Sequence, residues 1–205
     1  MKQQNHTLPS VARRIMIFFL IGMLVSFLSW IWETLDATFF LKSPNDRGFL
    51  TMPICPIYGV SLVLIYFLIG TPRTMRLLKK EILTKRPLLR YALYFVLSAL
   101  IASVVELLTG ILFKEVFGIY LWYYRGGVGN ILGLVALKPA IKWGVALTAF
   151  MRLVFDPILR WLYKRSNRAL AIWFWILLAL LLIDTTFNFT YLLIHGVRYK
   201  LPFYQ

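Results

Sequence analysis

Long apolar runs restrict this chain to a membrane fold. They occupy residues 15–35, 54–69, 91–113, 139–155 and 170–194. A helix needs about 20 apolar residues to cross the hydrocarbon core of a bilayer, and a chain with 60% hydrophobic and 15% charged residues offers little surface to water. We therefore predict one all-α domain over residues 1–205, a polytopic integral membrane helical bundle of about five transmembrane helices. The second and fourth runs are short and need flanking turns to complete a span.

The positive charge is concentrated in two connecting segments. Lys and Arg number 23 against 8 Asp and Glu. One segment holds Arg73, Arg76, Lys79, Lys80, Lys85, Arg86 and Arg90, and the other holds Arg152, Arg160, Lys164, Arg165 and Arg168. Cytoplasmic loops carry such an excess, so we predict a multi-pass protein of the cytoplasmic membrane with its N-terminus inside and its C-terminus outside. The expected partner of these charges is the lipid bilayer with its anionic headgroups, not nucleic acid.

The segment 118–137 does not fit a simple span. Trp122 and its neighbours resemble an interfacial aromatic belt, and three glycines then interrupt any helix. One interpretation is a re-entrant segment on the outer side, with the next span starting at Pro139. The other is one long tilted span over residues 130–155. We favour the re-entrant form, which requires the backbone to be buried in protein or to line a wet cavity.

Four carboxylates lie within or at the rim of the apolar runs: Glu33, Asp36, Glu106 and Asp184. A charge inside the bilayer is unfavourable by several kcal/mol unless it is paired or hydrated. In the predicted orientation all four fall in the extracytoplasmic half. This placement favours a single polar pocket that they share.

The candidate counter-charges are Arg47, Lys138 and Lys142. The two lysines share a helix face because they are four residues apart. Two roles remain open for these charged groups. They can form a substrate or ion pathway, or they can be structural ion pairs and interfacial side chains that reach back to the surface.

The stretch NDRGFLTMPICPIYG, residues 45–59, leads irregularly into the second apolar run. Its two prolines remove backbone donors and hold the residues before them extended. We expect helix from about Pro56, with free carbonyl groups beside the pocket. Arg47 can turn toward the carboxylates, and Tyr58 can offer its hydroxyl. Cys55 is the only cysteine, so no intrachain disulfide or multi-cysteine metal site is expected.

Several kinds of chemistry lack the residues they need. His6 and His195 are the only histidines, and no glycine pattern of a P-loop occurs. We therefore expect no enzyme, no cofactor and no metal site.

The order of motifs resembles a known family. The segments SFLSWIWET, NDRGFLTMPICPIYG, VELLTGILFKEVFG, LWYY and WG resemble the bacterial CmpB-like membrane proteins, the ABC-transporter type IV family, over about residues 27–144 and more weakly around Asp184. The matched positions are Trp30, Trp32, Glu33, Arg47, Gly48, Pro53, Cys55, Pro56, Tyr58, Gly59, Glu106, Thr109, Gly110, Gly118, Trp122, Tyr124, Asn130, Gly133, Trp143 and Gly144. The family tends to have Trp-Asp-Tyr at 122–124 and Asn-Leu-Asn-Gly-Arg at 130–134, so an acid, an amide and an arginine are missing here.

The resemblance implies a transporter permease subunit, which would need a separate ATPase subunit or another membrane protein as its partner. We expect a pocket for a small solute or ion built from Glu33, Arg47, Cys55, Tyr58, Glu106 and Asp184, with Asp36, Lys138, Lys142, Trp122, Tyr124 and Asn130 as secondary members. One alternative is a non-transporting accessory or assembly protein whose buried charges are structural. Another is a membrane enzyme acting on lipid or envelope precursors, which the scarcity of histidine disfavours.

Overall fold

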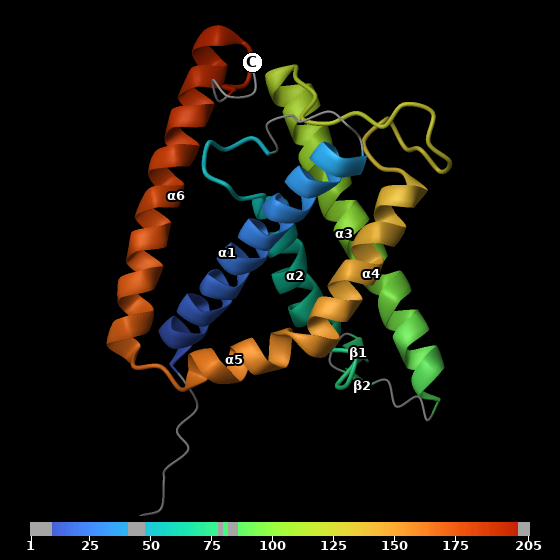
Figure 1. Cartoon of the computed structure of the whole chain (residues 1–205), viewed down its shortest axis with the longest axis vertical. Coiled ribbons are helices and arrows are strands. Elements are labelled where there is room, and N and C mark those ends of the chain that lie inside the picture. The colour runs from blue at the N-terminus through green and yellow to red at the C-terminus, as the bar shows by residue number, and fades with distance from the viewer. Residues whose placement is uncertain (1–9, 41–47, 78–79, 82–85, 201–205) are drawn as a thin grey trace, which may run out of the picture.

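The computed structural model describes residues 10–40, 48–77, 80–81 and 86–200. Its helices are α1 (Val11–Leu35, continued by the π-helical turn η1, Asp36–Phe40), α2 (Pro56–Ile69), α3 (Pro87–Phe117), α4 (Leu137–Leu153), α5 (Phe155–Tyr163) and α6 (Asn167–His195) (Figure 1). Two short strands, β1 (Arg76–Leu77) and β2 (Lys80–Glu81), pair antiparallel. By length and composition α1, α3 and α6 can cross a membrane, and α2 is a shorter apolar helix. The predicted all-α membrane bundle is confirmed.

Helix boundaries follow local signals in the sequence. Pro56 and Pro87 stand in the first turns of α2 and α3, where a missing backbone N–H is tolerated. Ser166 caps α6 by accepting a hydrogen bond from the backbone N–H of Ala169. Gly118 ends α3 with a φ of +68°, a conformation that glycine adopts without strain.

The helix α5 was not predicted. The apolar run at 139–155 is α4, which ends at Leu153, and the chain then turns into a separate helix of 9 residues. Asp156 and Pro157 stand in the first turn of α5, where an acid and a proline are typical of a helix start. That signal was present in the sequence, within a segment that we had treated only as a basic connection.

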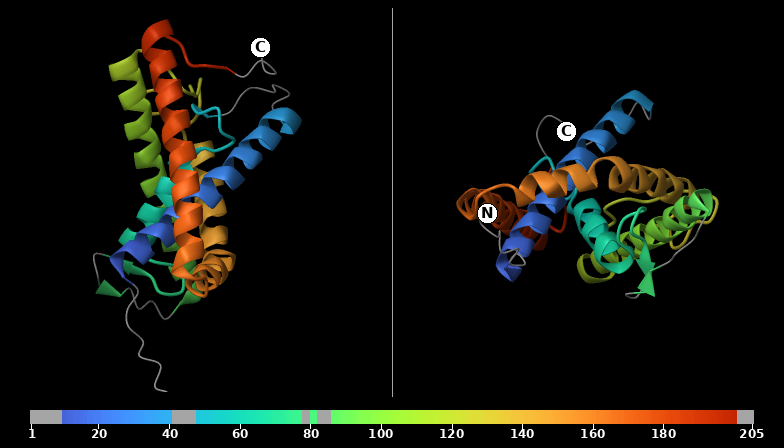
Figure 2. Two further views of the ribbon diagram at one scale, coloured as in Figure 1. Left: turned by 90° about the vertical axis from the view of Figure 1, so that its left-hand side faces the viewer. Right: turned by 90° about the horizontal axis from the view of Figure 1, so that it is seen from below.

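The described parts of the two basic segments lie at one end of the molecule. In Figure 1, α1 starts at the lower end, where β1, β2 and α5 also lie, and α6 ends at the upper end. We call the lower end the basic end. There α5 runs across the bundle, while α6 stands at its edge, packed chiefly on α1 (Figure 2). Only 6% of the most apolar stretch of α6 is buried, as expected of a helix that faces lipid.

Small residues let two pairs of helices approach closely. A Cβ atom on Gly59 of α2 would lie 2.2 Å from the carbonyl oxygen of Gly22 and 2.4 Å from Oγ of Ser26, both in α1. On the other side of the bundle, a Cβ on Gly144 of α4 would lie 2.8 Å from the Cβ of Ala99 in α3. Glycine at these positions therefore permits the backbone contacts that small residues provide in membrane bundles.

The segment 118–136 contains no helix. Ile131 and Val135 pair as an isolated bridge, and α4 begins only at Leu137. The tilted span over residues 130–155 is therefore wrong, because the left-handed glycines and turns of this segment prevent a continuous helix. The segment folds back onto α3, so that Leu134 would meet a Cβ on Gly110 at 2.9 Å. Gly110 lies about two turns inside the end of α3.

Candidate functional site

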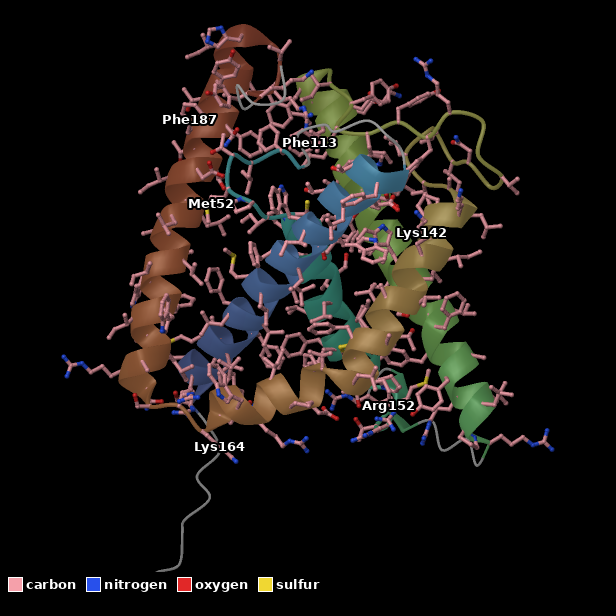
Figure 3. All side chains as sticks on the ribbon, viewed as in Figure 1. Met52, Phe113, Lys142, Arg152, Lys164 and Phe187 are labelled. Atoms are coloured by element: carbon pink, nitrogen blue, oxygen red, sulfur yellow. The ribbon has the colours of Figure 1, made fainter. Side chains whose placement is uncertain are left out.

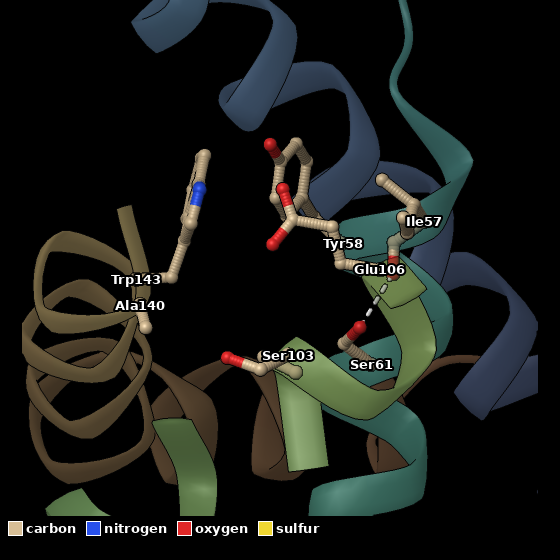
Figure 4. Close-up of a pocket in the computed structure, with 8 residues that line it drawn as sticks. Ile57, Tyr58, Ser61, Ser103, Glu106, Ala140 and Trp143 are labelled. Carbon is tan, nitrogen blue, oxygen red and sulfur yellow. Dashed lines mark hydrogen bonds between the residues drawn. The ribbon is translucent and has the colours of Figure 1, made fainter. Parts of the chain in front are cut away.

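Glu106 is a buried carboxylate beside a small cavity. It lies in the second half of α3, is 8% exposed, and accepts a 2.7 Å hydrogen bond from the hydroxyl of Tyr124. The cavity is lined by Ile57, Tyr58, Ser61, Ala102, Ser103, Glu106, Ala140 and Trp143. Figure 4 shows Tyr58, Glu106 and Trp143 pointing into the same space. The cavity has room for about one water molecule.

A second carboxylate, that of Glu33, is connected to the cavity through Tyr58. The Tyr58 hydroxyl donates a hydrogen bond to Glu33 of α1, and its ring stacks on Trp143 of α4 with centroids 3.7 Å apart. Four helices therefore converge here, since α1, α2, α3 and α4 each supply a side chain. We name Glu33, Tyr58, Glu106, Tyr124 and Trp143 the Glu106 site.

Tyr124 is positioned by the segment between α3 and α4. Its backbone N–H donates to the carbonyl of Gly133 at 2.8 Å, and its carbonyl accepts from the side-chain amide of Asn130. The Oδ1 of Asn130 in turn accepts from the Gly133 N–H at 2.6 Å. Trp122 fixes the same segment by donating to the carbonyl of Leu134 at 2.8 Å. Trp122 and Asn130, expected as secondary members of the pocket, therefore shape the loop that holds Tyr124.

The two lysines predicted as counter-charges lie away from the cavity. Lys142 forms an ion pair with Asp36 at 3.1 Å, and both side chains are partly exposed, at 48% and 24%. Neither residue lines the cavity. Lys138 is exposed and forms no ion pair with any residue that the structure describes. Arg47 lies outside the described residues.

Asp184 occupies a different place from Glu106. Its carboxylate accepts hydrogen bonds from the hydroxyl of Thr51, from the backbone N–H of Met52 at 3.1 Å, and from the side-chain amide of Asn188 at 3.2 Å. Asp184 is 8% exposed and Asn188 is fully buried. We name Thr51, Met52, Asp184 and Asn188 the Asp184 site. The structure thus replaces the one expected pocket with two separate sites.

The stretch between Gly48 and Cys55 joins three helices. Its Thr51 and Met52 contact α6 as described, and the N–H of Cys55 donates to the carbonyl of Ser26 in α1 at 2.9 Å. The Phe49 ring packs edge-on against Phe113 of α3 with centroids 4.9 Å apart. Cys55 is buried at the start of α2 and does not line the cavity. Its position supports α2 rather than the chemistry of the Glu106 site.

The sequence named most of the Glu106 site but not all of it. Trp143 was matched only through the family resemblance, and Ser61 and Ser103 were not singled out as pocket residues. Ser103 lies three residues before Glu106, a spacing that places both on one helix face. Among the described residues, no group of three or more His, Cys, Asp or Glu could hold a metal ion.

The long apolar helices and the carboxylates buried between them define an integral membrane protein of the helical-bundle class. A family model described as "Putative ABC-transporter type IV" matches residues 17–189. The chain therefore belongs to the ABC-transporter type IV family, as its motifs had indicated. The match runs from α1 into α6 and so spans both sites. Neither curated proteins nor solved structures gave a match.

Proposed function

We propose that the chain is a permease-like subunit of a membrane transporter, in which the Glu106 site binds a small cation. One observation carries this proposal. Glu106 is a buried carboxylate that faces a cavity and accepts its hydrogen bond from a neutral tyrosine. Within the described part of the chain, it forms no ion pair with Lys or Arg. Such a group inside a membrane protein is expected to serve a function rather than stability.

The surroundings of Glu106 suit a cation more than an anion or a large solute. A carboxylate away from bulk water is strongly unfavourable unless a positive charge neutralises it. The cavity has the size of a single water molecule, which fits a proton or a small monovalent ion.

The charge distribution supports an orientation for this site. The basic end would face the cytoplasm of the bacterial cell, and α6 would end outside. Glu106 lies about two-thirds of the way along α3 from the basic end. The Glu106 site would then occupy the extracytoplasmic half of the bundle.

We also propose that the chain is not an enzyme and does not bind ATP itself. Its sequence has no P-loop pattern. If transport is driven by ATP, the energy must come from a separate ATPase subunit or another membrane protein.

An accessory role remains the second candidate function. It is favoured by the tyrosine hydrogen bonds to Glu33 and Glu106, which a purely structural cluster would also make. In that case the carboxylates would hold four helices together without exchanging a ligand.

The experiment compares the melting temperature of purified wild-type protein and Glu106→Gln in detergent. The probes are Na⁺, K⁺, Li⁺ and protons, supplied as chloride salts or through the buffer pH, and tetramethylammonium, which is too large for the cavity, is the negative control. A cation present at about 100 times its Kd should stabilise wild type by about 2.7 kcal/mol, and Glu106→Gln should abolish that response.

Glu115→Gln is the matched control for this experiment. Glu115 is also in α3, but its side chain is 63% exposed and pairs with Lys114. This variant should respond to cations as wild type does. If no probe stabilises wild type, or if Glu106→Gln responds as wild type does, the cation-binding permease function is rejected in favour of the accessory function.

A further inference from the structure

The helix α5 has one face toward the core and one face toward the surroundings. Phe155 is fully buried and Leu162 is 6% exposed, both in the apolar core beneath α1 and α4. On the opposite face, Trp161 is 54% exposed and Arg160 is also exposed. A short helix that lies across the end of a membrane bundle, with an exposed tryptophan beside basic residues, is typical of the membrane interface (Figure 1).

The turn between α5 and α6 is held in place from α1. The guanidinium of Arg13 donates hydrogen bonds to the carbonyls of Tyr163 and Arg165, both at 2.8 Å, and to the side chain of Asn167. Ser166 then caps α6. These hydrogen bonds hold the backbone of the turn, and so they position the side chains that project from it.

Four exposed cations lie in the last turn of α5, in the connecting turn or in the first turn of α6: Arg160, Lys164, Arg165 and Arg168. None of them forms an ion pair with a residue that the structure describes. The acid nearest in sequence, Asp156, lies 4.0 Å from Arg73 instead. Figure 3 places Lys164 at this basic end, below α5. We call these four residues, together with Trp161, the α5–α6 corner.

Trp161 and Arg165 contact each other within the corner. The guanidinium carbon of Arg165 lies 4.1 Å from the Trp161 ring centroid, in a cation–π contact. Its N–H groups make no hydrogen bond to any residue in the described part of the chain. A guanidinium stacked in this way keeps its edge available for bidentate bonds to a phosphate.

We propose that the α5–α6 corner binds the phosphate of anionic lipid headgroups. The charge of the corner is complementary to such lipids, and each basic residue near an anionic surface contributes attraction. The indole of Trp161 would lie at the level of the headgroups, as amphipathic rings do in membranes. The binding of a lipid here is independent of the Glu106 site, which lies in the other half of the bundle.

The test measures binding of phosphatidylglycerol and of phosphatidylcholine to the purified full chain in neutral detergent, by native mass spectrometry. Wild type should bind phosphatidylglycerol in preference. Arg165→Gln/Arg168→Gln should weaken that binding about tenfold or more, because two attracting charges are lost. A control, Arg125→Gln/Lys138→Gln, removes two exposed cations at the opposite end and should leave the binding at the wild-type level.

Further arms separate the lipid from other ligands. Inorganic phosphate should not displace phosphatidylglycerol, and Glu106→Gln should bind it as wild type does, so that failure of the proposed function leaves this result intact. Lys164→Gln/Arg160→Gln provides a second corner variant that spares the stacked pair and should also weaken binding. Equal binding of the two lipids, equal loss in the control, or displacement by phosphate would overturn the proposal.

Discussion

The Glu106 and Asp184 sites each place one carboxylate on a long apolar helix, yet their surroundings differ. Asp184 accepts three hydrogen bonds, from the side chains of Thr51 and Asn188 and from the backbone N–H of Met52. Glu106 accepts one hydrogen bond, from Tyr124, and otherwise faces a cavity. This difference in donors is the basis of our proposal that Asp184 has a structural role and Glu106 a binding role.

The Asp184 site links the irregular stretch before α2 to α6, and we call this link the latch. Thr51 and Met52 belong to the irregular stretch before α2, and Asp184 ties that stretch to α6. Apart from this latch, α6 packs mainly on α1 and presents the rest of its surface to lipid. Loss of the latch should therefore loosen α6, whereas changes at Glu106 should leave the bundle intact.

Asp184→Leu is expected to have the largest effect on stability. Leucine has the same branched shape, is somewhat larger and accepts no hydrogen bond, so the partly buried Thr51 hydroxyl and Met52 N–H would lose their acceptor. The free energy of unfolding should fall by about 3 kcal/mol. Denaturant titration in detergent measures this change. Ile183→Leu is the control, since Ile183 is the 68% exposed neighbour. Unchanged stability in Asp184→Leu would mean that the latch does not hold α6.

Removal of one hydroxyl at each site sharpens the comparison. Thr51→Val deletes a donor to Asp184 while nearly preserving shape, and should lower the free energy of unfolding by about 1–2 kcal/mol. Tyr124→Phe deletes the donor to Glu106 and should lower it by about 1 kcal/mol or less, because the carboxylate can turn toward water in the cavity. The same denaturant titration distinguishes the two. A larger loss in Tyr124→Phe would show that the Glu106 site is the stronger structural element.

The smallest effect on stability is expected at the ion pair between Lys142 and Asp36, which we call the rim pair. Lys142→Gln removes the exposed ion pair with Asp36 and should change the free energy of unfolding by about 0–1 kcal/mol. Lys138→Gln, four residues earlier on α4, serves as the matched variant. A loss well above that range in Lys142→Gln alone would assign the rim pair a structural weight that its exposure does not suggest.

Much of the fold could be predicted from patterns along the chain. The apolar runs predicted five helices but not α5, Pro56 marked the start of α2, and the described parts of the basic segments are found together at one end of the molecule. The apolar runs and the helix start depend on residues that are close in sequence. The clustering of the cations depends on the membrane and water that surround all the helices. They need no knowledge of which helices touch.

The division into two sites could not be predicted in the same way. It depends on the irregular stretch before α2, where the hydroxyl of Thr51 and a backbone N–H reach Asp184 on a helix more than a hundred residues later. No periodicity indicates which carboxylate such a stretch will meet. Trp143 was likewise hidden, because its role arises only when α4 packs against α2 and α3.

The central claim is that Glu106 binds a ligand and Asp184 holds the fold. Its most direct test measures the melting temperatures of wild type, Glu106→Gln and Asp184→Asn side by side, with and without the cation that most stabilises wild type. Asparagine keeps one acceptor, so Asp184→Asn should melt lower yet retain the cation response. Glu106→Gln should melt close to wild type and lose that response. A cation response that persists in Glu106→Gln, or that disappears only in Asp184→Asn, would contradict the account.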